Sequence, residues 1–254
     1  MSPLTLLRRF RLPALVAAIG LLTGACGGDD VMPQNVLDPQ APIARQLDDL
    51  WNPVFAIACV IFVIVQGLVL WVAFRYRRRN DSDSPKQIHG HTGLELGWTI
   101  TPALILAVVG VATVANIGEL DAIPKGNDVM QVRVIGHQWW WEYQYPETGI
   151  VTANEMHIPA EAVIDVRITS ADVIHSFWPP KLAGKLDAVP GRENHLQIKT
   201  KGVKAGEYLG QCAEYCGLSH ANMRLKVIVH SPEDFKAWED GQVDSANLTF
   251  ADGS

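Results

Sequence analysis

The sequence predicts a membrane-spanning hairpin of two helices followed by an all-β sandwich or barrel. Two apolar runs, 51–74 and 96–115, are each long enough to cross a hydrocarbon layer of about 30 Å at about 1.5 Å per residue. From residue 129 onward the pattern changes to short runs rich in β-branched and aromatic residues, separated by Gly, Pro, Asn and Asp. Strands do not alternate with helical patterns, which argues against a fold of β-α-β units.

The first 25 residues are typical of an export signal. Arg8, Arg9 and Arg11 precede the apolar stretch 12–22, which is too short to be interpreted as a span. Cys26 directly follows a glycine and an alanine, as the lipidated cysteine does in a bacterial lipoprotein signal. Cys26 is therefore a candidate for lipid attachment. Cleavage nearby without lipidation, or an uncleaved anchor, would also explain the segment. Residues 26–50 follow as an exported amino-terminal segment.

Basic residues predict the orientation of the hairpin. Four arginines, Arg75, Arg77, Arg78 and Arg79, follow the first span and assign the loop 75–95 to the cytoplasm. The segment before the first span and everything after the second span are then extracytoplasmic. The expected membrane is a bacterial plasma membrane. A net charge of -6, with no other basic patch, argues against nucleic acid as a partner.

The β-domain is expected at 129–240, after a linker at 116–128. A serine, a proline and a glutamate at 231–233 predict the start of a short helix ending at Trp238, and 241–254 reads as a polar tail. The expected strands are 130–135, 139–145, 162–169, 194–200, 207–211 and 224–230.

One short segment, 212–223, contains two thiols, an imidazole and a thioether: Cys212, Cys216, His220 and Met223. Sulfur donors with imidazole select copper or zinc over hard cations, and a methionine is typical of electron-transfer copper. A one-copper site of that kind uses one cysteine, whereas two thiolates can bridge two copper ions. The second copper then needs another imidazole. His175, just after a predicted strand, is placed where a loop could present it.

Each of these residues has a simpler interpretation when taken alone. A Cys-x-x-x-Cys pair in an exported domain more often forms a disulfide or a redox pair. A lone His175 is usually a surface or hydrogen-bonded residue, and a lone Met223 usually packs in a core. Their joint occurrence on an exported β-domain behind a membrane hairpin favours copper. A membrane-anchored, thioredoxin-like copper metallochaperone also uses such a cysteine pair, but it needs a β-α-β pattern and a single span.

Over about residues 47–238 the chain resembles subunit II of the haem-copper cytochrome c oxidases. The resemblance implies a cupredoxin-like Greek-key domain with a binuclear copper centre, CuA. Its implied ligands are the side chains of His175, Cys212, Cys216, His220 and Met223 and the backbone carbonyl of Glu214. The Glu214 carboxylate is implied to bind a magnesium or manganese ion shared with subunit I. Quinol-oxidase relatives lack the copper ligands, so the full set excludes that branch.

The resemblance implies roles for two further residues. Trp139, in the segment 136–143, receives electrons from cytochrome c, whereas Trp140 and Trp141 are equally explained by filling a core and an interface. On a strand, Trp139 and Trp141 are expected to face the same way. Glu95, at the inner end of the second span, lies at the mouth of a proton channel that continues in subunit I. Thr92 and Glu95 also have the spacing of a helix capping box.

The resemblance also implies the partners and the reaction. All eight histidines lie outside the two spans, so haems within the membrane belong to a partner subunit. Cytochrome c passes electrons to the copper centre, which passes them to haem in subunit I, where oxygen is reduced and protons are pumped. A Cys-x-x-Cys-His motif is missing, so the donor is expected to be a separate cytochrome c. Subunit I, subunit III, cytochrome c and membrane lipid are the expected partners.

Overall fold

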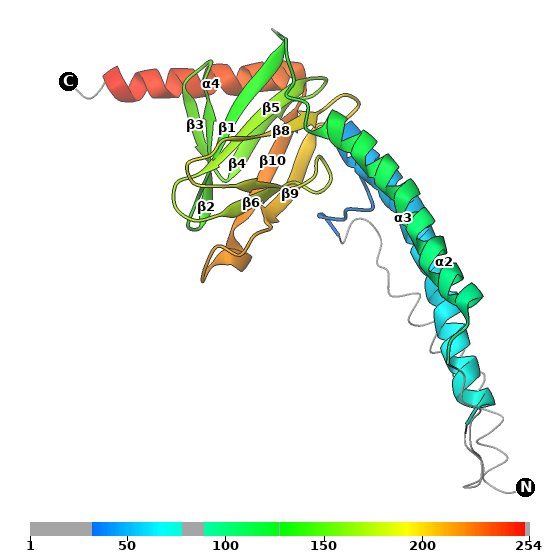
Figure 1. Ribbon diagram of the computed structural model, residues 1–254. Helices are drawn as coiled ribbons and strands as arrows, with labels where there is room; N and C mark the ends of the chain where they lie inside the picture. The colour runs from blue at the N-terminus through cyan, green and yellow to red at the C-terminus, as the bar shows by residue number, and fades with distance from the viewer. Residues whose placement is uncertain (1–31, 78–88, 127, 252–254) are drawn as a thin grey trace, which may run out of the picture.

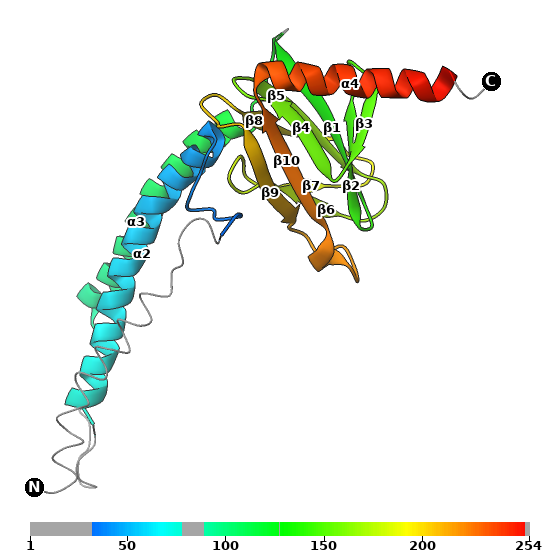
Figure 2. The same ribbon diagram turned by 180° about the vertical axis from the view of Figure 1, so that it is seen from behind.

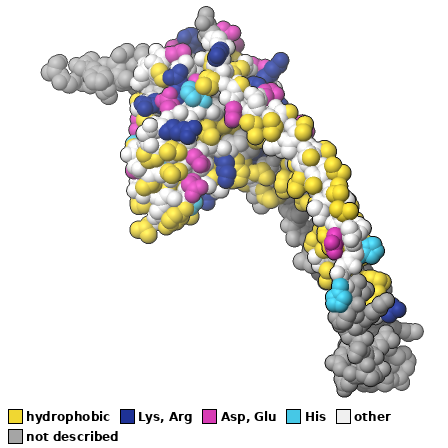
Figure 3. All heavy atoms as spheres, in the orientation of Figure 1, with side chains coloured by type: hydrophobic (Ala, Val, Ile, Leu, Met, Phe, Trp, Pro, Cys, Tyr) yellow, Lys and Arg dark blue, Asp and Glu magenta, His cyan; other side chains and the backbone are white. Residues whose placement is uncertain are grey.

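Two long helices lead into a β-sandwich in the computed structural model, which describes residues 32–77, 89–126 and 128–251 (Figure 1). The expected export signal and Cys26 lie outside these residues. Helices α2 (Pro42–Arg75) and α3 (Thr92–Leu120) lie side by side in both views (Figures 1 and 2). Both are long and apolar enough to cross a membrane. Hydrophobic side chains cover the visible face of these helices, whereas charged ones are scattered over the sandwich (Figure 3). The predicted architecture is confirmed.

Helix α2 begins nine residues before the apolar run that predicted it, at a proline suited to the first helical turn. Ile43 and Ala44 in this turn are buried. The N-cap of helix α3 is His91, one residue before Thr92, which was the predicted cap. The Leu94 N–H donates to Nδ1 of His91, and the His91 N–H donates to Oε1 of Glu95, both at 3.3 Å. The reciprocal cap therefore uses His91 and Glu95, because the imidazole replaces the expected hydroxyl.

The sandwich has two five-stranded sheets. Strand order is β3-β2-β1-β5-β8 in the first sheet and β4-β10-β9-β6-β7 in the second. Two parallel pairs, β1 with β5 and β4 with β10, connect otherwise antiparallel neighbours. The first sheet contains β1 (Val129–His137), β2 (Trp140–Tyr145), β3 (Ile150–Ala153), β5 (Val163–Ser170) and β8 (Asn194–Lys199). The second contains β4 (Glu155–Pro159), β6 (His175–Trp178), β7 (Leu186–Ala188), β9 (Gly206–Cys212) and β10 (Arg224–His230).

Alternate residues of the central strands form the core between the sheets. On β1, Val132 and Val134 are fully buried while Arg133 between them is exposed. On β10, Leu225, Val227 and Val229 face inward in the same way. The buried face of β2 carries Trp141, Tyr143 and Tyr145. The core of the sandwich is therefore packed by side chains from both sheets.

The carboxyl-terminal helix α4 (Pro232–Ala251) is longer than predicted and includes most of the expected polar tail. Ser231 starts it, because its Oγ accepts from the Asp234 N–H at 3.1 Å and donates to the Asp234 carboxylate at 2.7 Å. No proline interrupts the helix after Pro232. Trp238 docks α4 on the sandwich by stacking on His157 with ring centroids 4.3 Å apart.

The docking site contains a pair of histidines that should make it sensitive to pH. His157 Nδ1 lies 2.8 Å from His230 Nε2, so one N–H joins the two rings. Burial and the charge of His230 lower the pKa of His157 to about 4, and burial lowers the pKa of His230. Glu155 and Asp234 oppose these shifts, and Lys226 reinforces the one at His157. The neutral pair is the form that fits the folded contact.

We therefore expect the protein to lose stability as the pH falls from about 6.5 towards 4. The folded pKa of His157 lies below its ordinary value, so the neutral ring contributes fully above the unfolded pKa and loses its contribution on protonation. Because His157 is only half-buried, screening limits the effect to about 1–2 kcal/mol. Thermal unfolding of the detergent-solubilised chain at both pH values measures it. His157→Phe keeps a ring against Trp238 and should reduce this loss; an equal loss in both proteins contradicts the prediction.

Candidate metal centre

The pairing of β6 with β9 brings distant parts of the chain together at one end of the second sheet. His175 is the first residue of β6, and Cys212 is the last residue of β9. Cys212 pairs with Phe177 of β6. The chain then passes through a short 3-10 helix, His220–Asn222, and enters β10 after Met223. The expected placement of His175 in a loop is wrong: it is a strand residue and is fully buried.

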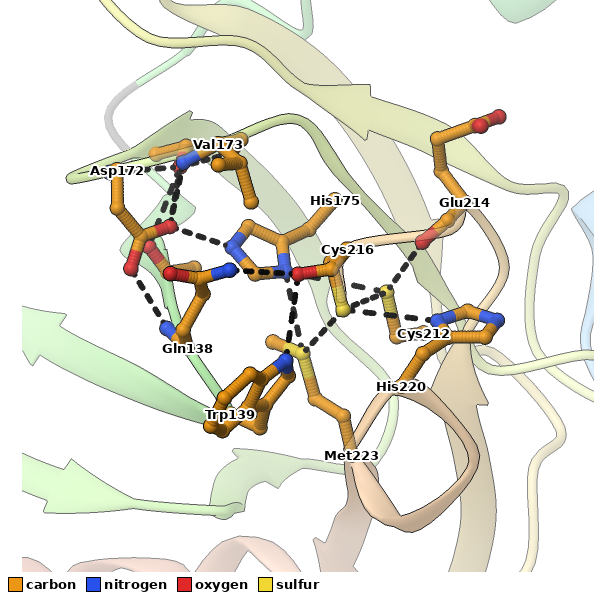
Figure 4. Close-up of polar contacts among 12 residues, drawn as sticks. Gln138, Trp139, Asp172, Val173, His175, Cys212, Glu214, Cys216, His220 and Met223 are labelled. Atoms are coloured by element: carbon orange, nitrogen blue, oxygen red, sulfur yellow. Dashed lines mark hydrogen bonds and ion pairs between the residues drawn. The ribbon is translucent and has the colours of Figure 1, made fainter. Parts of the chain in front are cut away.

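Five side chains and one backbone carbonyl converge on a single cluster (Figure 4). The two thiol sulfurs, of Cys212 and Cys216, are 3.8 Å apart. His175 Nδ1 is 3.9 Å from the Cys212 sulfur and 3.1 Å from the Met223 sulfur. His220 Nδ1 is 3.5 Å from the Cys216 sulfur, and the Glu214 carbonyl oxygen is 3.2 Å from the Cys212 sulfur. The structure therefore brings together all six of the predicted donor residues.

The donors divide into two groups on opposite sides of the sulfur pair. Figure 4 shows His175 and Met223 on one side, and His220 with the Glu214 carbonyl on the other. Each side thus offers one imidazole and one weaker donor, and both sides share the two thiols. Such soft and borderline donors suit copper.

The sulfur separation is compatible with bridging by metal and not with a disulfide. A disulfide requires about 2.05 Å between sulfurs, so 3.8 Å leaves Cys212 and Cys216 as free thiols. Metal–thiolate bonds of about 2.3 Å are longer than half of that separation. One ion can therefore reach both sulfurs from either side, as the donor groups require. The residues present fit a pair of copper ions.

Asp172 fixes the orientation of the buried His175 ring. Its Oδ1 lies 2.7 Å from Nε2, the ring nitrogen that faces away from the sulfurs. The Asp172 carboxylate also accepts from the backbone N–H groups of Gln138 at 2.6 Å and Val173 at 2.6 Å. A carboxylate in this place sets the tautomer that leaves Nδ1 free for metal. The role of Asp172 was not anticipated from the sequence, where it is marked only by its place three positions before His175.

The two thiols differ in acidity. Burial raises the pKa of Cys212, but hydrogen bonds with His175 and with the backbone at Ser176 and Glu214 outweigh it and lower this pKa. Burial and the negative charge of Cys212 raise the pKa of Cys216. Burial lowers the pKa of His175, but its contacts with Cys212 and Asp172 outweigh burial and raise it. The cluster thus favours the thiolate form at Cys212 over that at Cys216.

Trp139 lies in the turn between β1 and β2, directly beside the cysteine loop. Its indole N–H donates to the Cys216 carbonyl at 3.2 Å, and the Gln138 amide donates to the same oxygen at 2.7 Å. Gly217 permits this approach. Its φ of 122° suits glycine, and a Cβ there would lie 3.0 Å from the Gln138 amide nitrogen and 3.3 Å from the Trp139 ring. The contribution of Gln138 was not anticipated from the sequence.

The three adjacent tryptophans have different environments. The predicted strand at 139–145 begins only at Trp140, so the expectation that Trp139 and Trp141 face the same way as strand neighbours is wrong. Trp139 is 36% exposed, whereas Trp141 is fully buried with its ring 5.8 Å from that of His175. Trp140 stacks on His137 at 4.4 Å.

Glu214 and Glu95 are placed differently relative to the cluster. The Glu214 carbonyl points at the sulfurs, while its carboxylate is exposed and points away from them (Figure 4). Glu95 lies at the start of α3, and the β-domain follows the other end of that helix (Figure 1). The structure therefore does not bring Glu95 to the candidate metal centre.

Comparisons with known proteins give one family for both parts of the chain. The transmembrane domain of cytochrome c oxidase subunit II matches residues 31–115, and the periplasmic domain of the same subunit matches 150–231. The probable cytochrome c oxidase subunit 2 of Rickettsia bellii is 31% identical over 94% of this chain and 95% of its own length. Cytochrome c oxidase subunit 2 of Alkalihalophilus pseudofirmus is 33% identical over 87% of this chain.

This chain spans only 64% of the length of the Alkalihalophilus protein. Among solved structures, the periplasmic domain of subunit II of cytochrome oxidase from Bradyrhizobium japonicum is 33% identical and covers 49% of this chain and 99% of its own, with a TM-score of 0.45. The matched domains and the identity across the whole Rickettsia protein agree. The chain belongs to the cytochrome c oxidase subunit II family and is a membrane protein with two spans.

Proposed function

We propose that this chain is the electron-accepting subunit of a respiratory cytochrome c oxidase, an oxidoreductase complex. Electrons from cytochrome c reach the chain at Trp139, pass through a binuclear copper centre and continue to haem in subunit I, where oxygen is reduced and protons are pumped. The observation that carries this proposal is the division of the donors into two groups around a shared pair of thiols.

The ligands proposed for the two copper ions are His175 and Met223 on one side and His220 with the Glu214 carbonyl on the other, with Cys212 and Cys216 shared. When bound, the copper pair supplies a one-electron carrier that spreads the charge change over two ions. The protein holds the donors still: His175, Cys212, Cys216 and Met223 are all at most 3% exposed. Buried, fixed donors keep the rearrangement that accompanies each electron transfer small.

Trp139 is proposed as the residue that receives the electron. It is the exposed aromatic side chain that hydrogen-bonds the backbone of a proposed ligand. This contact gives a short covalent and hydrogen-bonded route from the protein surface to Cys216. The net charge of -6 favours a basic donor such as cytochrome c.

Four further assignments complete the proposal. The Glu214 carboxylate, which faces away from the copper ligands, binds magnesium or manganese shared with subunit I. Glu95 lies at the mouth of a proton channel. The β-domain faces the extracytoplasmic side of a bacterial plasma membrane, with subunits I and III and lipid as neighbours. Cys26 is the lipidated residue.

A copper metallochaperone is the second candidate from another class, because it also uses two thiols and a distant histidine. The described chain has two potential spans, and its β-domain is a sandwich of two sheets rather than a fold of β-α-β units. A delivery protein would also have no need for donors divided over two sides. The oxidase subunit therefore explains more of the structure.

Copper binding tests the proposal directly. The detergent-solubilised chain, freed of metal and titrated with copper, should bind two ions per molecule and turn purple. Its electron paramagnetic resonance should show one unpaired electron shared by two copper nuclei. His220→Ala should lose this signal, whereas His195→Ala, at a histidine bonded to Asp165 outside the centre, should keep it. A colourless protein or a one-copper protein contradicts the proposal.

Replacing Trp139 tests the route of the electron. In the assembled oxidase, Trp139→Phe removes the indole N–H and should slow reduction by cytochrome c at least about tenfold, or about 1.4 kcal/mol in barrier. The copper signal should persist. Trp140→Phe is the matched control, because Trp140 stacks on His137. Stopped-flow kinetics measures both variants, and equal rates would show that Trp139 is not the receiving residue.

Replacing Glu95 separates its capping role from proton uptake. Glu95→Gln keeps an oxygen that can accept from the His91 N–H, so the helix start should remain. In oxidase vesicles, proton release per electron should fall while copper content stays constant. Glu119→Gln, at the opposite end of the same helix, is the control. Unchanged turnover and pumping in Glu95→Gln would remove the channel role.

A further inference from the structure

Strand β1 contains a glycine, Gly136, whose presence is not explained by its backbone conformation. It lies near the end of the middle strand of three, opposite Trp141 on β2 and Ser170 on β5. Gly136 is not among the described glycines that have a positive φ, so other residues could adopt its backbone conformation. It is buried on the same face of β1 as Val132 and Val134. A glycine in a strand interior weakens the strand and often marks a close approach by another group.

The group that approaches Gly136 is the imidazole of His175. A Cβ at position 136 would lie 2.7 Å from Cδ2 of His175, 3.0 Å from Cγ and 3.3 Å from the His175 Cβ. Contacts below 3.0 Å are essentially never made by real Cβ atoms. The ring of His175 therefore fills the space that a side chain at position 136 would need.

The imidazole has little room to move away from Gly136. Its Nε2 is held by Asp172 at 2.7 Å, and its Nδ1 lies 3.1 Å from the Met223 sulfur. The Trp141 ring packs against it with the planes inclined at 62°. Restoring an ordinary contact of 3.4 Å requires the ring or the strand to shift by about 0.7 Å. Metal–ligand distances tolerate only about 0.2 Å.

We propose that Gly136 is a positioning residue for the metal centre: its missing side chain sets the place of His175. The effect of Gly136 on copper binding rests on the proposed function. The steric contact between Gly136 and His175 is present in the metal-free chain. The glycine acts through His175 and touches no metal itself. It accounts for why the inward face of β1 carries valines at two positions and no side chain at the third.

The contact is tested in the metal-free chain by a double-mutant cycle. Gly136→Ala should lower the unfolding midpoint of the full-length protein in detergent. In the His175→Ala background the same substitution should have much less effect, because the ring is gone. If Gly136→Ala alone does not fold, recovery of folding in the double variant supports the proposal, and failure to recover overturns it. Equal effects in both backgrounds also overturn it.

The consequence for metal is tested by copper titration and electron paramagnetic resonance. Gly136→Ala should weaken copper binding by about 10- to 100-fold and lose the signal shared by two coppers. Val134→Ala, two residues away on the same buried face, should lower stability and keep that signal. A normal signal in folded Gly136→Ala overturns the proposal. If the unmutated chain binds no copper, the proposed function fails, while the cycle still decides the contact between Gly136 and His175.

Discussion

The pairing of β6 with β9 is the constraint on which the metal centre depends. It places the buried His175 within 3.9 Å of the Cys212 sulfur, although the two residues are separated by 37 positions along the chain. Cys212 is anchored a second time, because its N–H donates to the Met223 carbonyl at 2.9 Å where the cysteine loop returns to the sheet. The ends of two strands therefore determine where one imidazole, one thiol and one thioether lie, and the sandwich core keeps those ends fixed.

The donor types could be predicted from the sequence, but the way they are held could not. Cys212, Cys216, His220 and Met223 lie within one short segment, so their spacing alone indicated a shared metal site. The six strands that were predicted are the longest in the domain, with six to nine residues each, whereas the four missed strands have three to five. Periodicity cannot be recognised over so few residues. The missed strand β6 is the one that carries His175.

The contacts missed at the site join residues whose relation depends on the fold. Asp172 and Gln138 look like ordinary loop residues in the sequence. Their neighbours in the sequence do not show that Asp172 contacts a buried imidazole or that Gln138 donates to the Cys216 carbonyl. The same limit applies at the helix ends. Thr92 had the expected capping spacing, but His91 provides the cap. Helix α4 also continued beyond its predicted end, since its sequence after Pro232 contains no proline to stop it.

The metal-free centre is already arranged for the charge it is proposed to hold. With its pKa lowered by His175, Cys212 favours the thiolate, while the resulting negative charge keeps the Cys216 thiol protonated. A metal held by both sulfurs would therefore take the place of the Cys216 proton. Because Asp172 holds Nε2, Nδ1 faces the sulfurs without any turn of the ring. Metal would thus enter a donor set whose geometry the strands have already established.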